Sequence, residues 1–393
     1  MAWTRFEPAN MLAEDWLSGT FVGRIETTAG PSPILVRRGI AFDMSAVAPT
    51  VSALLDRRNS TGAAGVELGA LDALNLRAPN ERSDPTLLAP VDLQCIKAAG
   101  VTFAVSAIER VIEERARGDA AAARDVRDRL EARMGASMRS VVPGTAAAAE
   151  LKIALIEQGL WSQYLEVAIG PDAEIFTKAP VLASVGWGAD IGVRSDSNWN
   201  NPEPELVLIV DSTGRTVGAT LGNDVNLRDF EGRSALLLGK AKDNNASCAL
   251  GPFIRLFDET FTLDDVRSDK VELQIEGADG YRLSGNSSMR EISRDPAALV
   301  SQALSEHQYP DGFALFLGTL FAPVQDRDEP GRGFTHKTGD VVRISSPRIG
   351  TLVNRVTTSK AAAPWTLGIG ALMSNLAGRG LLTSPPQRSV AAR

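Results

Sequence analysis

The amino-acid sequence predicts an α+β fold in which a small N-terminal α+β unit precedes a larger, mainly β unit. Two patterns lead to this prediction. Short apolar runs separated by Gly, Asn and Asp fill the C-terminal two-thirds of the chain, and helical periodicity is concentrated between residues 101 and 160. The length points the same way, because 393 residues with 44% hydrophobic and 23% charged side chains suit a globular protein with one large domain and an appendage, or two domains.

The first ninety residues are predicted to form the small α+β unit. Strand-like runs cover 21–26, 34–38 and 40–44, and a short helical pattern lies near 51–57. The stretch APNERSDPTLLAP, at 78–90, is polar, contains proline and has no periodicity, so we interpret it as a linker. This places a small N-terminal domain at 1–90 and the larger domain at 91–393.

The larger domain is predicted to begin with helices and to continue with strands. Helical periodicity with a dense mixed-charge surface covers 101–134, and a second helix is expected at 146–160. The last dozen residues, 382–393, have the composition of a frayed tail. The strands expected after Trp161 lie at 181–185, 206–210, 271–275, 314–317 and 341–344.

Charge and composition exclude several classes of protein. The chain has 41 Lys plus Arg against 48 Asp plus Glu, with no basic stripe, so a nucleic-acid partner is not expected. No apolar run approaches the roughly 18 residues that span a bilayer, and no secretory signal opens the chain, so we expect a cytoplasmic protein without a membrane partner. Two cysteines and two histidines exclude a disulfide framework, a thiolate zinc cluster and a three-histidine site.

A pair of carboxylates at the start of an apolar strand is the most informative feature. In NPEPELVLIV, Glu203 and Glu205 are two residues apart, so both side chains point to the same face of the strand. Half-buried neighbouring anions repel each other and favour a shared divalent cation. Asp224, nineteen residues after Glu205, offers a third oxygen ligand, and such a set suits Mg²⁺ or Mn²⁺ better than zinc. The alternative is an exposed strand that carries alternate Glu residues for solubility.

The segment after this strand is unusually polar for a stretch between apolar strands, which favours the metal-site interpretation over a plain surface. Within it, Arg228 and Asp229 are expected to form an ion pair that supports the metal loop. The polar residues of this stretch are Asn223, Arg228, Asp229, Glu231, Arg233, Lys242, Asp243, Asn244 and Asn245.

Four strings together resemble the fumarylacetoacetate hydrolase superfamily over roughly residues 90–382: PEPELVLIV, GNDVNLRDFEG, KDNNASCALGPFIRLFD and LFLGTLFAP. The string EGRSALLLGKAKDNNASCALGPF resembles the branch of 2-keto-3-deoxypentonate (arabinonate or xylonate) dehydratases. The resemblance implies a mixed β-sandwich roll, a homodimer or higher homo-oligomer, and a divalent ion, Mg²⁺ or Mn²⁺, held by Glu203, Glu205 and Asp224.

The resemblance also implies roles for individual residues. Lys242 stands at the position of the family's active-site lysine, six residues before the cysteine of the C-x-L-G-P turn. Gly318 and Thr319 match the family's Gly-Thr pair, whose amide and hydroxyl hold a substrate carboxylate. Asn223 and Glu231, from the polar stretch, complete the expected substrate-binding set.

One departure from the family pattern concerns the lid motif N-Y-x-x-H-x-x-E, whose His and Glu activate water in the hydrolases. Here the corresponding stretch reads TFAVSAIE, so Ser106 takes the histidine position and only Glu109 remains. Serine is no base at neutral pH, which places hydrolysis in doubt and favours a dehydratase. The candidate catalytic residues are therefore Lys242, Glu109 and Ser106. Glu113 and Glu114 are alternates for Glu109, and a plain helix surface is the competing interpretation of Glu109.

We therefore expect a metal-dependent dehydratase that converts a 2-keto-3-deoxy sugar acid, a pentonate, to 2-oxoglutarate semialdehyde (2,5-dioxopentanoate) in sugar catabolism. Lys242, with a lowered pKa beside the cation, is expected to act as base or hydrogen-bond donor, and Glu109 as the acid-base group at carbon 4. The alternatives are a hydrolase or tautomerase of acylpyruvates or diketo acids through the same enolate chemistry, and a non-catalytic protein with a structural cation site.

Overall fold

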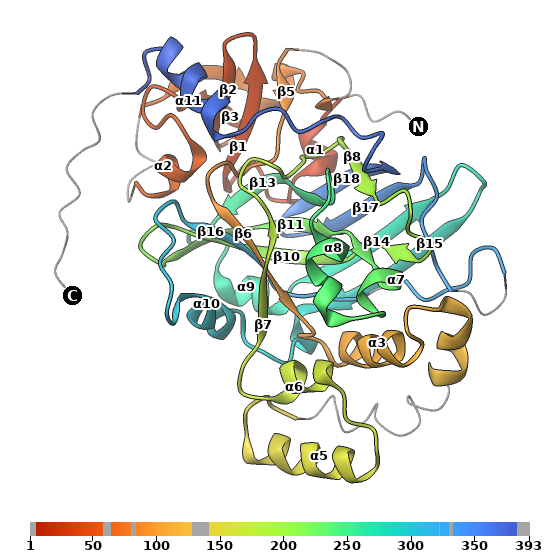
Figure 1. Ribbon diagram of the computed structural model, residues 1–393. Helices are drawn as coiled ribbons and strands as arrows, with labels where there is room; N and C mark the ends of the chain where they lie inside the picture. The colour runs from red at the N-terminus through yellow and green to blue at the C-terminus, as the bar shows by residue number, and fades with distance from the viewer. Residues whose placement is uncertain are drawn as a thin grey trace.

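The computed structural model describes residues 5–57, 64–79, 84–127, 141–321, 323–329 and 333–382. Its largest element is a mixed sheet with the strand order β4-β3-β2-β1-β13-β11-β10-β16-β6-β7, and β5 pairs with β1 beside this path. A second sheet has the order β15-β14-β17-β18-β8, and the short strands β9 (Asn200–Asn201) and β12 (Asn226–Leu227) pair with each other. The α+β class predicted from the sequence is confirmed (Figure 1).

The N-terminal strands continue the large sheet and do not form a sheet of their own. They are β1 (Thr20–Thr27), β2 (Gly30–Arg37), β3 (Ile40–Asp43), β4 (Val66–Ala70) and β5 (Thr86–Leu87). β1 pairs antiparallel with β13 (Cys248–Leu256), with Phe21 opposite Arg255 and Val22 opposite Ile254. The expected linker at 78–90 contains β5 and the cis Asp84–Pro85 bond, and its residues 80–83 lie outside the described ranges.

The centre of the large sheet is an antiparallel pair, β10 (Pro204–Val210) and β11 (Thr216–Asp224), in which Glu205 lies opposite Gly222 and Leu206 opposite Leu221. Every residue of β10 is buried, which explains why its residues 206–210 form a continuous apolar run and not an alternating one. On its other side β10 pairs with β16 (Phe313–Phe316), which runs parallel to β6 (Cys95–Gly100), and β6 pairs with β7 (Glu174–Ala179).

The second sheet packs against the first across a common core. Its strands are β8 (Asp190–Val193), β14 (Lys270–Glu276), β15 (Arg282–Ser288), β17 (Val341–Ser346) and β18 (Gly350–Thr358). In β14 the residues alternate between exposed and buried, so one face of this antiparallel sheet meets the core and the other meets water. Leu206 and Leu208 of β10 belong to the same hydrophobic cluster as Leu273 and Ile275 of β14.

Three helices form a hydrophobic cluster of their own at one end of the sheets (Figure 1). α3 (Ala104–Arg115), α5 (Ala146–Glu157) and α6 (Gln163–Ile169) contribute Val111, Ile112, Leu155 and Leu165 to it, together with Trp199. Further helices are α1 (Pro8–Met11), α2 (Val51–Leu55), α7 (Arg228–Glu231), α8 (Leu238–Lys242), α9 (Leu263–Ser268), α10 (Pro296–Leu304) and α11 (Ile369–Gly378).

Most predicted elements are confirmed, and the strand expected at 181–185 is wrong. Leu182 has a φ of 67° and its N–H bonds Asp92 O, so the chain turns there, and only Val185 forms a single bridge, to Ala249. The helix expected over 101–134 ends at Arg115, and residues 120–127 are helical again. Residues 128–140 and the tail at 383–393 lie outside the described ranges. Within those ranges no helix is both long and apolar enough to cross a bilayer.

Candidate metal centre

The β10–β11 pair brings Glu203, Glu205 and Asp224 together at one end of the large sheet. Glu203 directly precedes β10, Glu205 is its second residue, and Asp224 is the last residue of β11. The Asp224 N–H donates to Glu203 O at 3.0 Å, which fixes the two chain ends side by side. Each carboxylate has an oxygen within 4.8 Å of the others, and all three side chains are at most 2% exposed. The alternative of an exposed strand does not hold, because these side chains are buried.

Three cationic side chains surround the carboxylates. Lys242, at the end of α8, donates from Nζ to Glu203 Oε2 at 2.5 Å and to Asp224 Oδ2 at 2.9 Å. Lys178 of β7 is fully buried, and its Nζ lies 2.8 Å from Asp224 Oδ1 and also donates to the carbonyl oxygens of Val225 and Lys242. Arg110 of α3 contacts Glu203 Oε1 through Nη2.

The charges of this cluster shift its pKa values in opposite directions. Burial raises the pKa of Glu205 well above its usual value, and the charges of Asp224 and Glu203 raise it further. Burial would also raise the pKa of Glu203, but Lys242 and Arg110 outweigh it and hold that pKa at about 2. Burial would lower the pKa of Lys242, yet Asp224 and Glu203 raise it above its usual value, which is opposite to the lowered pKa expected from the sequence.

The Gly-Thr pair is part of the same centre. The Gly318 N–H donates to Glu205 Oε2 at 2.7 Å, and Thr319 Oγ1 donates to Glu205 Oε1 at 3.3 Å. Gly318 has a φ of 104°, and a Cβ there would lie 1.8 Å from Thr102 Oγ1, so only glycine fits. In this arrangement the pair orients a candidate metal ligand, and Thr319 also lines the adjoining cavity.

Asn223 and Glu231, the other expected substrate-binding residues, take different places. Asn223 Oδ1 accepts the Glu203 N–H at 3.1 Å, so Asn223 positions a carboxylate and does not line the cavity. Glu231 lines the cavity, and its Oε2 lies 3.1 Å from Arg110 Nη1. The expected ion pair between Arg228 and Asp229 is wrong: Arg228 binds Glu113 and Asn201, whereas Asp229 accepts from Ser197 and the Asn198 N–H.

The two candidate lid residues make contacts that the sequence alignment does not suggest. Ser106 lines the cavity, but its hydroxyl donates to Phe103 O at 2.8 Å and accepts from the Phe103 N–H, capping the start of α3. Glu109 lies outside the cavity and is held by Arg127, whose Nη2 lies 2.7 Å from Glu109 Oε2. Arg110, the next residue of α3, points into the cavity instead because successive helical residues face directions about 100° apart.

Glu174, at the start of β7, is a cavity-lining carboxylate that the sequence analysis missed. It lies opposite Gly100 of β6, where a Cβ would come within 2.0 Å of Glu174 Oε2, so the glycine makes room for the carboxylate. Within the described ranges Glu174 has no hydrogen-bond or ion-pair partner. Burial, and then the charge of Glu231, raise the pKa of Glu174 to about 7.

The donor set and the charge balance both fit a divalent cation. Three hard carboxylate oxygens are the ligands that Mg²⁺ and Mn²⁺ prefer. The cavity between them has a volume of about 10 Å³, close to the space of one water molecule. Ionised, the surrounding groups carry two more negative than positive charges: Glu113, Glu174, Glu203, Glu205, Asp224 and Glu231 against Arg110, Lys178, Arg228 and Lys242.

Lys178→Met is expected to lower the free energy of unfolding by about 3–5 kcal/mol, because it leaves the Asp224 carboxylate buried beside other anions with one cation fewer. Chemical denaturation of the full chain measures this. The matched control is Lys97→Met on the neighbouring strand, where Lys97 bonds Thr177 at an exposed position, and the expected cost is below about 1 kcal/mol. If the two variants lost the same free energy of unfolding, Lys178 would not stabilise the buried Asp224 carboxylate as we expect.

Sequence reasoning found the three carboxylates and Lys242, and it named Glu113 only as an alternate for Glu109. It missed Arg110, Lys178 and Glu174 as parts of the site. A weak signal existed for Lys178 and Glu174, since a short strand, EIFTKA, carries both charges on an otherwise apolar pattern. Arg110 and Glu113 carry no local signal that separates them from the surface charges of the same helix.

Comparison with known proteins finds relatives that match about half of this chain. The family model for the fumarylacetoacetate (FAA) hydrolase C-terminal region matches residues 157–357. A 2-dehydro-3-deoxy-D-arabinonate dehydratase of Saccharolobus solfataricus is 34% identical over 183 residues, which are 47% of this chain and 58% of that protein. A probable 2-keto-3-deoxyxylonate dehydratase of Haloferax volcanii is 32% identical over 202 residues, 51% of this chain and 66% of that protein. The matches thus span less than two-thirds of these relatives.

The fold is also similar to solved structures. A 2-keto-3-deoxy-D-arabinonate dehydratase complexed with magnesium and 2,5-dioxopentanoate aligns with a TM-score of 0.60 and 22% identity, covering 86% of this chain and 99% of the other. The apo form of a 2-keto-3-deoxy-D-arabinonate dehydratase aligns with a TM-score of 0.61 over the same shares. At this identity the likeness concerns the fold, and it confirms the mixed β architecture expected from the family resemblance.

Proposed function

This chain belongs to the fumarylacetoacetate hydrolase family, and from that premise we propose that it is a divalent-cation-dependent dehydratase of 2-keto-3-deoxy sugar acids. The proposed reaction converts a 2-keto-3-deoxypentonate to 2,5-dioxopentanoate in sugar catabolism. The single observation that carries the proposal is the buried cluster of Glu203, Glu205 and Asp224 beside the cavity-lining Glu174, which has no partner among the described residues. The dehydratases of S. solfataricus and H. volcanii, at 34% and 32% identity, support the substrate class.

Glu203, Glu205 and Asp224 would hold the cation, and the oxygen donors favour Mg²⁺ or Mn²⁺. When bound, such an ion supplies Lewis-acid polarisation of a 2-keto oxygen and so favours loss of a proton from the neighbouring carbon. Gly318 and Thr319 orient Glu205, and Lys178 orients Asp224. These residues keep the carboxylate oxygens directed at one point.

Glu174 and Lys242 are the proposed proton-transfer groups. Glu174 has a pKa of about 7 and no competing partner within the described ranges, so its carboxylate accepts the proton from carbon 3. Lys242 uses two of its three N–H donors on Glu203 and Asp224, which leaves the third to protonate the departing hydroxyl of carbon 4. The C3–H and C4–O bonds break, a C3–C4 double bond forms and water leaves. Tautomerisation then places an aldehyde at carbon 5.

Dehydration is favoured over hydrolysis because no imidazole lines the described cavity. Ser106 caps α3, His307 is exposed and stacks on Tyr309, and His336 is buried against Asp340. A hydrolase of this family would need, at the position of Ser106, a base that activates water. Because Ser106 is no such base, we rank a hydrolase or tautomerase of acylpyruvates as the second candidate.

Entry of an acid of this size requires the cavity to open, since its volume of about 10 Å³ accommodates no sugar acid. We propose that α3 moves outward and withdraws Arg110 from Glu203. α3 packs mainly in the separate hydrophobic cluster with α5 and α6, so these helices can move without breaking the core between the two sheets. We also propose, from the family resemblance, a homodimer or higher homo-oligomer.

Incubation with a panel of 2-keto-3-deoxy acids and acylpyruvates, with and without Mg²⁺, tests the proposed function. We expect Mg²⁺-dependent loss of one water molecule from a 2-keto-3-deoxypentonate, detected by mass analysis, and an aldehyde product. Cleavage of acylpyruvates into two fragments would favour the second candidate. Turnover that persists in EDTA would contradict both.

A further inference from the structure

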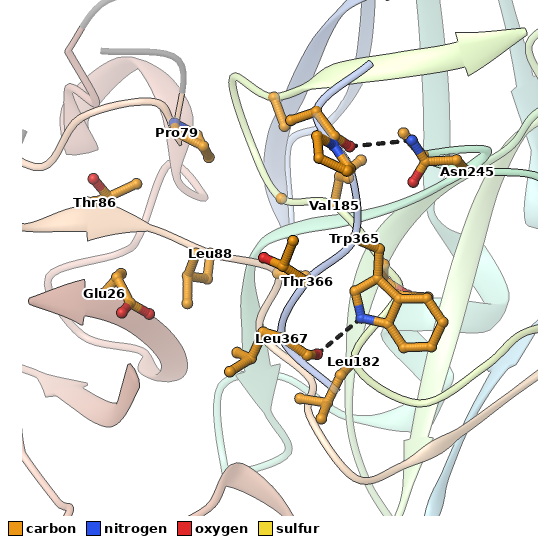
Figure 2. Close-up of a pocket in the computed structure, with 18 of the residues that line it drawn as sticks. Glu26, Pro79, Thr86, Leu88, Leu182, Val185, Asn245, Trp365, Thr366 and Leu367 are labelled. Carbon is orange, nitrogen blue, oxygen red and sulfur yellow. Dashed lines mark hydrogen bonds between the residues drawn. The ribbon is translucent and has the colours of Figure 1, made fainter. Parts of the chain in front are cut away.

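A second cavity, of about 630 Å³, shares no lining residue with the metal centre. Its walls come from β1 and the strand region around Leu88, from the turn at 182–190, and from the segment 363–371 that leads into α11. Figure 2 shows Glu26, Thr86 and Leu88 on one side and Val185, Trp365 and Leu367 on the other. The volume falls in the range of small-molecule sites.

Arg24 of β1 lines this cavity and forms no ion pair with a carboxylate of the described residues. Its side chain is 5% exposed, and its Nε and Nη1 atoms are buried without a hydrogen bond to any described residue. A buried charge without a partner costs several kcal/mol, so proteins rarely retain one unless it binds something. The neighbouring Asp92 does not fill this role, because its oxygens accept the N–H groups of Val51, Ser52 and Leu93.

Glu26 supplies the opposite charge in the same cavity. It lies two residues after Arg24 on β1, so both side chains project from the same face of the strand. Glu26 has no hydrogen-bond or ion-pair partner in the part of the chain that the structure describes. Asp190, the other lining carboxylate, is held by Arg355 at 3.0 Å. The cavity therefore offers one cationic and one anionic group side by side.

The opposite wall is apolar and anchored. Leu182, Leu367 and the half-exposed indole of Trp365 face the cavity, and Trp365 Nε1 donates to Leu367 O at 2.8 Å (Figure 2). Asn245 Nδ2 donates to Ser359 O at 3.2 Å and to Ala363 O at 3.1 Å, which ties the 363–371 segment to the fold. An apolar group therefore finds a preformed surface across from the charged strand.

We propose that this cavity binds a small organic acid that carries a hydrogen-bond donor, hydroxyl or ammonium, on the carbon next to its carboxylate and an apolar group beyond it. Arg24 holds the carboxylate, Glu26 accepts from the donor, and Leu182, Leu367 and Trp365 cover the apolar group. The site is independent of the metal centre and of the proposed dehydration, because none of its residues belongs to that cavity.

Calorimetric titration of the full chain with four probes that share a 3-methylbutyl group tests the proposal: L-leucine, 2-hydroxy-4-methylpentanoate, 4-methylpentanoate and 3-methylbutylamine, which lacks the carboxylate. We expect at least one of the first two to bind about tenfold or more tightly than 4-methylpentanoate, and the amine not to bind. The bound ligand should change the tryptophan fluorescence of the wild type, and Trp365→Phe should lose that change while still binding. Absence of binding by both donor-bearing acids would overturn the proposal.

The variant Arg24→Met tests whether Arg24 binds the carboxylate of the ligand. Without ligand we expect its Tm to rise by roughly a few degrees, because an unpaired buried charge is removed, and with ligand the stabilisation seen in the wild type should be lost. Arg282→Met, at an exposed position on β15, is the matched control and should keep the ligand-induced shift. Glu26→Gln is the second variant and should reduce the advantage of the donor-bearing acids over 4-methylpentanoate, because the amide keeps one acceptor oxygen but loses the charge. Unchanged binding in both Arg24→Met and Glu26→Gln would contradict the site.

Discussion

Glu205→Gln is expected to abolish cation binding and to lower turnover by about a thousandfold or more, while the chain remains folded. Glu205 is 1% exposed and lies beside Glu203 and Asp224. Its oxygens accept hydrogen bonds from Gly318 and Thr319 and are placed to bind a cation. The amide keeps the shape and one acceptor oxygen but removes the charge that attracts the ion. The loss in turnover follows from the lost Lewis acid and not from misfolding.

The stability of Glu205→Gln separates a loss of turnover caused by the missing cation from one caused by misfolding. Burial, Asp224 and Glu203 each raise the pKa of Glu205, which means that its ionised form is disfavoured when no cation balances it. The variant without cation should therefore be at least as stable as the wild type. At a Mg²⁺ concentration of 100 times its Kd the wild type should gain about 2.7 kcal/mol, and the variant should gain none.

Thermal unfolding and calorimetric titration with Mg²⁺ and Mn²⁺ measure both effects. Glu272→Gln, on an exposed position of β14, is the matched control and should behave as the wild type. If Glu205→Gln kept both cation binding and turnover, the three-carboxylate centre would be wrong. If it lost the cation but kept turnover, the ion would be structural, as in the non-catalytic alternative.

The metal carboxylates were predictable because their geometry is local. Two residues at strand spacing share a face, and Asp224 follows on the partner strand of the same antiparallel pair, so alternation and chain reversal alone bring them together. The mainly β character of the C-terminal part was predictable for the same reason, since β14 and β17 show clear apolar patterns in sequence.

The cations and Glu174 were not predictable because their positions depend on non-local contacts. Glu174 and Lys178 reach the centre only through the pairing of β7 with β6, whose register shifts between Ile96 and Lys97. Arg110 rather than Glu109 faces the carboxylates because of the rotation of α3 about its axis, which the helix packing sets. An alignment of eight residues to a lid motif cannot resolve a rotation of one residue.

Glu174→Gln is expected to lower kcat by about 10²–10⁴-fold and to leave the Mg²⁺ affinity within a few-fold of the wild type. The carboxylate is the proposed proton acceptor, and it does not contact Glu203, Glu205 or Asp224 directly. Because its pKa is about 7, wild-type kcat should rise with pH through that value, and the variant should lack this rise. Steady-state kinetics between about pH 5 and 9 measure it.

Glu109→Gln is the matched control, because Glu109 is held by Arg127 outside the cavity, and its kcat should stay within a few-fold of the wild type. If Glu109→Gln lost activity and Glu174→Gln did not, the lid alignment would be right and the structural assignment wrong.

Stability gives an independent readout of the same carboxylate. A pKa raised from 4.5 to about 7 in the folded protein means that the stability contributed by Glu174 is present at low pH and is lost as pH rises through about 7. Glu174→Gln removes this dependence. Its free energy of unfolding relative to that of the wild type should therefore increase between pH 4.5 and about 7, whereas that of Glu109→Gln should not. A catalytic carboxylate kept partly protonated by burial shows both effects, and a surface carboxylate shows neither.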